Sequence, residues 1–131
     1  EKITLKGYYD RVTAVAITPD GKYAISASYA SGDRTFNVLN LENGEEKIIT
    51  VRHNRDVTAV AITPDGKYAV SASGSIFDPT LEVWNLENGE NVSNFIGDNS
   101  FRTCNISPDG KIIAASDYLG RMHFFHLVTP H

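Results

Sequence analysis

The sequence predicts an all-β fold made of β-propeller blades, and two observations carry this prediction. The first is a tandem repeat, because residues 12–24 return letter for letter as residues 57–69, and a third, altered copy covers residues 104–114. The Pro-Asp-Gly motifs of the copies stand 45 and 44 residues apart, and periods of about 40–50 residues are typical of propellers and solenoids. The second observation is a series of short runs that alternate apolar and polar residues, which indicates strands rather than helices.

Each repeat contains four predicted strands joined by turns. In the first repeat we expect them over residues 12–17, 22–27, 35–39 and 47–51, and the second repeat copies this order. Residues 18–21 read Thr-Pro-Asp-Gly, which is typical of a tight turn because proline fixes φ at its second position and glycine suits its fourth. An Asn-Gly pair between two alternating runs predicts the next turn, over residues 42–45. Four antiparallel strands in this order are the content of one propeller blade.

The chain begins and ends out of phase with these blades. Residues 2–6 match the fourth strand of a repeat, and residues 121–127 match the third strand. We therefore treat residues 1–131 as one segment of three four-stranded blades, in which the strand over residues 2–6 completes the last blade of a closed ring. The repeats are divided at residues 1–46, 47–90 and 91–131.

Three blades are too few for a ring, since a propeller typically has four to eight. An isolated set of three exposes an apolar face at each end. We expect the ring to be completed either by a second copy, giving a homodimer with six blades, or by the remaining blades of a longer array.

Composition excludes several classes of protein. The formal net charge of −4 argues against a nucleic-acid surface, which is usually basic. No apolar run approaches the roughly 20 residues of a membrane span. Cys104 is the single cysteine, so no internal disulfide can form and a reducing, cytoplasmic compartment is expected.

The second repeat resembles the WD40 repeat. His53, Ser71, Asp78 and Trp84 stand around the Pro-Asp-Gly turn in the order and spacing of that family. The resemblance implies that the four side chains form a buried, hydrogen-bonded tetrad. One departure is Asn85, which replaces the aspartate of the Trp-Asp pair.

The other two repeats keep less of this pattern. The first retains only Ser26 and Asp33, and the third has lost the tetrad altogether. We therefore expect the third blade to be stabilised by packing alone, through four apolar side chains: Ile112, Met122, Phe124 and Phe125.

Residues 95–100 and 120–127 are similar to the closing repeats of bacterial WD40 arrays, some of which are attached to STAND-type signalling ATPases. That resemblance implies an alternative function, as the ligand-sensing C-terminal part of such an ATPase. The sequence itself contains no Gly-x₄-Gly-Lys-Ser/Thr motif for nucleotide binding.

Nothing in the sequence indicates catalysis, a cofactor or a metal. His53, Asp78 and Ser71 have the residue types of a hydrolytic triad, but a triad is defined by geometry, and the tetrad explains these residues better. His123 and His126 are three residues apart on one strand and point to opposite faces. Cys104 occupies a core position of the repeat, where a thiol behaves as a small hydrophobe.

The remaining prediction is a protein-contact surface. In the first two repeats the connection between the second and third strands carries extra residues, within residues 29–32 and 74–77. We expect these loops to emerge on the same face as the loop before the first strand, where aromatic and arginine side chains would meet a partner protein. The candidate contact residues are Tyr8, Tyr9, Arg11, Tyr29, Asn54, Arg55, Asp56, Ile76 and Phe77.

Two alternatives accompany this prediction. Tyr29 and Phe77 can instead fold back onto their own blades or seal the junction between two copies. The predicted function is a protein-interaction scaffold or sensor, and a small-ligand or carbohydrate-binding propeller is the alternative from another class.

Overall fold

A computed structural model describes residues 11–18, 20–30, 33–51, 57–73, 79–97 and 99–127. Within these ranges the strand ends at 11–12, 29–30, 33–34, 49–51 and 73 are described in their backbone only. The predicted strand over residues 2–6 lies outside the described residues.

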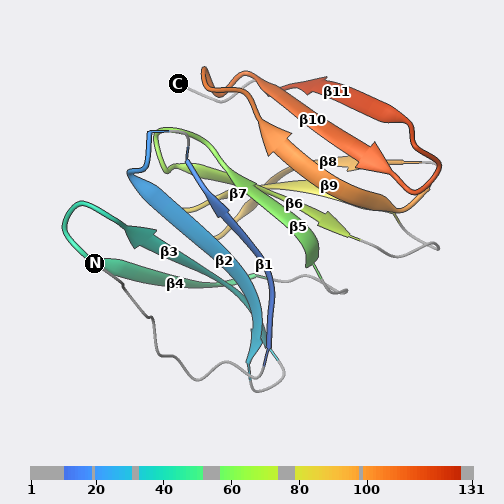
Figure 1. Ribbon diagram of the computed structural model, residues 1–131. Coiled ribbons are helices and arrows are strands. Elements are labelled where there is room, and N and C mark those ends of the chain that lie inside the picture. The colour runs from blue at the N-terminus through green and yellow to red at the C-terminus, as the bar shows by residue number, and fades with distance from the viewer. Residues whose placement is uncertain are drawn as a thin grey trace.

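The described residues form strands and no helix, arranged in three antiparallel sheets (Figure 1). The first sheet has the order β1-β2-β3-β4, and its strands are β1 (Arg11–Ile17), β2 (Tyr23–Ala30), β3 (Asp33–Asn40) and β4 (Glu46–Val51). The second has the order β5-β6-β7-β8, with β5 (Val57–Ile62), β6 (Tyr68–Ser73), β7 (Thr80–Asn85) and β8 (Asn91–Ile96). The third has the order β11-β10-β9, with β9 (Phe101–Ile106), β10 (Ile112–Asp117) and β11 (Met122–His126).

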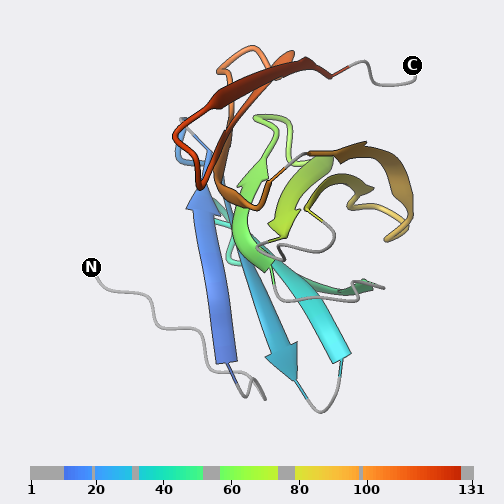
Figure 2. The ribbon, with the colours of Figure 1, turned by 90° about the vertical axis from the view of Figure 1, so that its right-hand side faces the viewer.

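The sheets are stacked face to face in chain order. The first strand of each sheet lies at the inner edge of the stack, so that β1 contacts β5 and β5 contacts β9. Figure 2 shows the same stack from the side, with successive sheets turned relative to one another. This is the arrangement expected of consecutive propeller blades.

The Thr-Pro-Asp-Gly turn forms as the sequence predicts. In the second repeat the Gly66 amide donates to the Thr63 carbonyl at 2.8 Å, and the Asp65 carboxylate accepts from the Thr63 hydroxyl at 2.6 Å and from the Lys67 amide at 2.9 Å. Gly66 has a φ of 74°, which glycine adopts without a steric penalty. A turn with the same hydrogen bonds follows β9, built on Ser107 and Asp109.

The second predicted turn lies in the expected place but is longer than a two-residue hairpin. Strand β7 ends at Asn85 and β8 begins at Asn91, and the intervening loop closes with a hydrogen bond from the Gly89 amide to the Asn85 carbonyl at 2.8 Å. The Asn85 side chain also accepts from the Glu87 amide at 2.8 Å. Asn85, which replaces the aspartate of the Trp-Asp pair, therefore caps this loop through its side-chain oxygen, an acceptor that aspartate also has.

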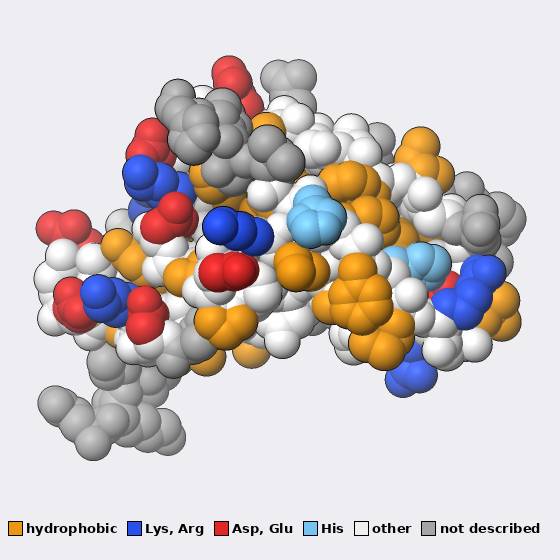
Figure 3. All heavy atoms as spheres, turned by 90° about the horizontal axis from the view of Figure 1, so that it is seen from above, with side chains coloured by type: hydrophobic (Ala, Val, Ile, Leu, Met, Phe, Trp, Pro, Cys, Tyr) orange, Lys and Arg blue, Asp and Glu red, His pale blue; other side chains and the backbone are white. Residues whose placement is uncertain are grey.

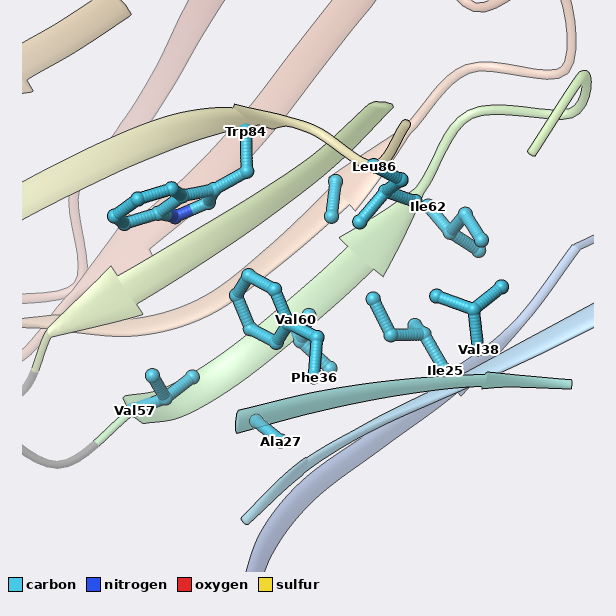
Figure 4. Close-up of a cluster of buried hydrophobic side chains, with 10 residues drawn as sticks. Ile25, Ala27, Phe36, Val38, Val57, Val60, Ile62, Trp84 and Leu86 are labelled. Atoms are coloured by element: carbon cyan, nitrogen blue, oxygen red, sulfur yellow. The ribbon is translucent and has the colours of Figure 1, made fainter. Parts of the chain in front are cut away.

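The core lies at the junctions between sheets rather than within one sheet. At the first junction Val60 and Ile62 of β5 point towards Phe36, Ile25 and Val38 of the first sheet (Figure 4). Trp84 and Leu86 extend the same cluster, and the Trp84 ring meets Phe36 edge to face, with centroids 6.0 Å apart. The second junction repeats this plan with a cluster from the second and third sheets: Val70, Ala72, Leu81, Val83, Phe101, Ile106, Ile113 and Ala115.

One predicted loop is partly strand. Strand β2 continues to Ala30 and β3 begins at Asp33, with Tyr29 paired to Arg34 in the ladder. Tyr29 and Ala30, which were expected in the loop, thus lengthen the hairpin in register, and residues 31–32 lie outside the described residues. A buried hydrogen bond of 2.9 Å between the Ser28 and Thr35 hydroxyls ties the two strands just before this extension.

The prediction for the third blade was wrong in two respects. Ile112, Met122 and Phe124 are exposed, because each lies on the outer face of the stack, where the described chain places no further sheet. Phe125 does pack, against Phe95 of β8 with ring centroids 4.5 Å apart. The third blade is also not held by packing alone, since it has a buried polar cluster centred on Asp117.

Candidate protein-contact site

The turn between β10 and β11 is fixed by the buried carboxylate of Asp117. One oxygen accepts hydrogen bonds from the backbone amides of Leu119 and Arg121, at 2.9 and 3.0 Å. The other is 3.0 Å from both Arg121 Nε and His123 Nε2. Gly120 completes the turn with a φ of 81°. Four donors on one carboxylate hold the turn in a single conformation.

These donors also determine the charge of the site. The hydrogen bond with His123, followed by those from Arg121 and from the turn amides, lowers the pKa of Asp117 far below its usual range. Burial opposes this effect but is outweighed. Asp117 is therefore a permanent anion at neutral pH, and it holds the cationic Arg121 beside it.

The turn presents apolar surface to solvent. Tyr118 is 57% exposed and Leu119 is 68% exposed. The Arg102 guanidinium of β9 lies 5.3 Å from the centroid of the Tyr118 ring, within the range of a cation–π contact. The Tyr118 amide donates to the carbonyl of the buried Ser100 at 3.1 Å, which ties the turn to the start of β9. We call Arg102, Tyr118 and Leu119 the Tyr118 patch.

The Tyr118 patch has the composition of a protein-contact site. Tyrosine and arginine are enriched among the residues that dominate binding energy at interfaces. Tyr118 and Leu119 also leave most of their apolar surface in water, and exposed apolar surface that forms a patch is a common feature of interaction sites.

Most of the contact residues predicted from sequence lie outside the described part of the chain. Arg11 and Tyr29 are described only in their backbone, and seven others are not described: Tyr8, Tyr9, Asn54, Arg55, Asp56, Ile76 and Phe77. Arg11 and Tyr29 are backbone partners in the ladder between β1 and β2, and as a contact site the nine residues remain a prediction.

The Tyr118 patch occupies the place in the third blade that those residues are expected to occupy in the first two. Its turn connects the second and third strands of the sheet, and Arg102 stands at the start of the first strand. Sequence reasoning chose this face and these residue types but missed Tyr118, Leu119 and Arg102. The signal in the sequence is the Tyr-Leu pair before Gly120, which places two large side chains at a turn.

Half of the predicted tetrad lies within the described residues. Trp84 Nε1 donates to the Ser71 hydroxyl at 2.9 Å, and both side chains are buried. His53 and Asp78 are outside the described residues, so the complete tetrad remains a prediction. In the first blade Ser26 is half-buried on β2 and Leu39 takes the place of the tryptophan, while the side chain of Asp33 is not described.

A groove lies at the first junction, beside the Pro-Asp-Gly turn of the second sheet. This groove has a volume of about 360 Å³, and its apolar lining includes Tyr23, Val38 and Leu86. Glu46 and Lys67 also line it, and the ammonium of Lys47 donates across it to the Glu87 carbonyl at 3.0 Å. Because the groove is lined by charges of both signs, it favours neither anionic nor cationic ligands.

The described residues offer no three His, Cys, Asp or Glu side chains placed to hold a metal ion. His123 faces inward to Asp117, whereas His126 is exposed, as expected for residues three apart on a strand. The same residues contain no helix with the length and apolar character to cross a membrane.

Comparison with known proteins agrees with this geometry. The family model of the WD40 repeat, described as the WD domain or G-beta repeat, matches residues 1–39 and 45–85, which together are more than half of the chain. The chain belongs to the WD40 repeat family. A comparison with curated proteins finds no relative at a significant level.

The WD40 fold is also found among solved structures. The β-propeller domain of Cps50 (Swd1) from Myceliophteria thermophila superposes on this WD40 segment with a TM-score of 0.70 at 17% identity. The match covers 100% of this chain and 39% of that domain's chain. The all-β propeller fold predicted from the sequence is thereby confirmed.

Proposed function

We propose that this WD40 segment is a non-catalytic protein-interaction scaffold or sensor module that binds a partner protein through the Tyr118 patch. One observation carries the proposal: Tyr118 and Leu119 are exposed on a turn whose conformation is fixed by the buried Asp117 carboxylate. WD40 propellers commonly serve as protein-binding scaffolds, which supports the same function.

The fixed turn reduces the cost of binding. A flexible loop loses conformational freedom when it meets a partner, and this loss subtracts from affinity. The hydrogen bonds to Asp117 have already ordered the backbone around Leu119 and Arg121, and the Arg102 contact restrains the Tyr118 ring. A partner that covers the patch therefore gains the burial of both apolar side chains at little further entropic cost.

The proposal includes the setting of this surface. The propeller ring is completed by a second copy, giving six blades, or by the blades of a longer array, and the strand over residues 2–6 fastens the last blade. The tetrad of His53, Ser71, Asp78 and Trp84 stabilises the second blade. The lone Cys104 and the lack of an internal disulfide support a cytoplasmic location.

A photo-crosslinking amino acid at position 118 provides the test. We expect it to capture a partner protein in cells, whereas the same group at the exposed Glu87, outside the patch, does not capture that protein. With the captured partner purified, Tyr118→Ala should weaken binding by roughly tenfold or more, as is usual for an interface hot spot. Val92→Ala, a change at an exposed position of β8, is the matched control and should leave affinity unchanged. Equal affinities for the wild type and Tyr118→Ala would reject the patch as the contact site.

A small-ligand or carbohydrate-binding function is the second candidate, and the groove beside Tyr23 favours it. An aromatic ring next to charged and amide side chains is a suitable wall for a polar ligand. As the sensing part of a signalling ATPase, the segment would use the same groove. A ligand that raises the melting temperature of the wild type but not of Tyr23→Ala would support this function over the first.

A further inference from the structure

The two ends of the sheet stack expose faces whose counterparts are buried at junctions inside the chain. We define the leading face as Val15 and Ile17 of β1, and the trailing face as Ala114, Ser116, Met122 and Phe124 of β10 and β11. At each internal junction, the leading side of one sheet packs on the trailing side of the sheet before it.

The leading face of the first sheet is identical in sequence to a buried one. Residues 12–24 and 57–69 are the same, yet Val60 and Ile62 are 5% and 4% exposed, whereas Val15 and Ile17 are 72% and 63% exposed. Since the residues do not differ, only their position at the end of the stack explains the change. Within the described chain, this surface of β1 therefore lacks the neighbouring sheet that covers the identical surface of β5.

The trailing face of the third sheet has the same paired positions as the first sheet's trailing face, occupied by different residues. In the first sheet Ile25 is paired with Val38 across β2 and β3. The same pair of positions in the third sheet holds Ala114 opposite Phe124. The loss of bulk on β10 is thus compensated by a gain on β11, and volume-conserving exchanges of this kind are the ones that packed surfaces tolerate best.

A second pair on the trailing face repeats this relationship. Ala27 is paired with Phe36 in the first sheet, a small residue opposite a large one, and Ser116 is paired with Met122 in the third. The Ser116 and Thr103 hydroxyls hydrogen-bond to each other at 2.6 Å. Burial of this pair in a junction would leave the hydroxyl that donates this bond with its partner. Figure 3 looks onto this end of the molecule and shows hydrophobic side chains gathered side by side on its surface.

We propose that the leading face of one copy packs on the trailing face of a second copy, with Val15 directed to Met122 and Ile17 to Phe124 and Ala114. The template is the first internal junction, in which Val60 meets Phe36 and Ile62 meets Val38 and Ile25 (Figure 4). This inference rests on the ring closure within the proposed function and names the surfaces that perform it. Because the two faces differ, the contact is head to tail, and two copies that use both faces close a ring.

Light scattering on the whole chain, over a range of concentrations, tests the contact. We expect a mass of about twice 14.4 kDa. Ile17→Glu and Phe124→Glu should each weaken self-association by roughly tenfold or more, because each buries an unpaired charge at the junction. Ile96→Glu makes the same change at another strongly exposed position, on β8, and should leave the mass unchanged. A monomer up to the solubility limit overturns the inference, as does equal sensitivity to all three changes.

Crosslinking distinguishes head-to-tail from head-to-head contact and needs no disruptive substitution. Ile17→Cys mixed with Phe124→Cys, both in a Cys104→Ser background, should give crosslinked dimers with a short bismaleimide. Either variant alone should give none, and crosslinks in Ile17→Cys alone would mean head-to-head contact and overturn the inference. Circular dichroism of each variant verifies that it is folded.

The inference and the proposed function fail separately. A chain that stays monomeric but still loses its partner on Tyr118→Ala retains the interaction function without the junction between copies. A dimer whose partner binding is unaffected by Tyr118→Ala retains the junction without the contact site. A mass of three or more copies with the expected sensitivity at Ile17 and Phe124 supports the contact but overturns the six-bladed ring.

Discussion

Trp84 donates a hydrogen bond of 2.9 Å to the hydroxyl of Ser71, which joins β7 to β6 inside the second sheet. The indole also packs edge to face on Phe36 of the first sheet. One side chain thus serves both the register of its own blade and the junction with the blade before it.

Trp84→Ala should be the most damaging single change in the second blade. We expect it to lower the free energy of unfolding by about 3–5 kcal/mol, the usual cost of removing a buried large aromatic side chain. Trp84→Phe keeps a ring against Phe36 but loses the donor to Ser71, so it should cost less. Urea titration followed by circular dichroism measures both. A loss below about 1 kcal/mol for Trp84→Ala, the range of ordinary surface changes, would place the indole outside the core.

Gly66 and Gly21 offer a matched pair of substitutions. Both have positive φ, 74° and 75°, in turns of identical sequence, so an alanine at either position is strained. A Cβ at Gly66 would lie 2.9 Å from the ring of Tyr23 in the first sheet, whereas a Cβ at Gly21 meets nothing within 4 Å. Gly66, unlike Gly21, therefore also leaves room for the Tyr23 ring at the junction between the first and second sheets.

Gly66→Ala should therefore destabilise more than Gly21→Ala. The backbone strain, of order 1 kcal/mol, is common to both, and the difference between them reports the displacement of Tyr23. Thermal unfolding of the two variants gives this difference directly. If Tyr23→Ala is added, the two glycine substitutions should become equal in effect. If Gly66→Ala and Gly21→Ala destabilise the wild type equally, the Tyr23 ring moves aside at no measurable cost.

The sequence predicts the blades well because the repeat and the turn residues act locally. Within the described residues, the Pro-Asp-Gly turns and the alternating strands lie within a few residues of the predicted positions, since each depends on φ preferences and side-chain period within a few positions. The exposure of Val15 and Ile17 could not be predicted in this way. Their sequence is that of Val60 and Ile62, and only the place of the sheet in the stack separates them.

The contact site shows a different limit of sequence reasoning. The loss of the tetrad in the third repeat was visible, but its replacement by Asp117, Arg121 and His123 was not, because these residues have no place in the WD40 pattern. They converge only once the turn between β10 and β11 has formed. Family resemblance identifies residues that a pattern shares, and it misses those that a single blade uses differently.

The Asp117 cluster predicts a pH dependence of stability. Its carboxyl has a pKa that is lower in the folded protein than the value of about 3.9 in the unfolded chain. The group therefore contributes stability above the unfolded pKa, and this contribution is lost as the pH falls through the folded pKa. We expect the wild type to lose stability as the pH falls below about 4, because Asp117 of the unfolded chain then takes up a proton while the folded carboxyl is still charged.

Asp117→Asn isolates this contribution. At pH 7 the variant should melt at a lower temperature, because the amide cannot accept from all four donors at once. The difference from wild type should shrink as the pH falls from about 4 towards the folded pKa, because proton uptake by the unfolded wild-type chain progressively removes the stabilisation that the ionised carboxylate gives. Thermal melts of both proteins from neutral to acid pH measure the difference in melting temperature. Asp20 and Asp109 also have pKa values lowered by the hydrogen bonds of their turns, but their contributions are common to both proteins and cancel in the difference. A constant difference across that range would contradict the assignment. Tyr118→Ala is the control and should leave the acid dependence unchanged.

Cys104 reports on the second junction. Its sulfur lies 3.8 Å from the Val70 carbonyl of the second sheet, and burial raises the pKa of the thiol to about 12. Since the thiolate is the reactive form, we expect very slow reaction with a disulfide reagent such as DTNB at pH 8 in the native protein and fast reaction in denaturant. A Lys111→Cys variant in a Cys104→Ser background, with its thiol at an exposed position, should react fast without denaturant. Phe125→Ala, which removes the ring contact with Phe95, should accelerate the labelling of Cys104 by loosening the junction. Native labelling of Cys104 as fast as that of the exposed thiol would mean that the second and third sheets do not stay packed together.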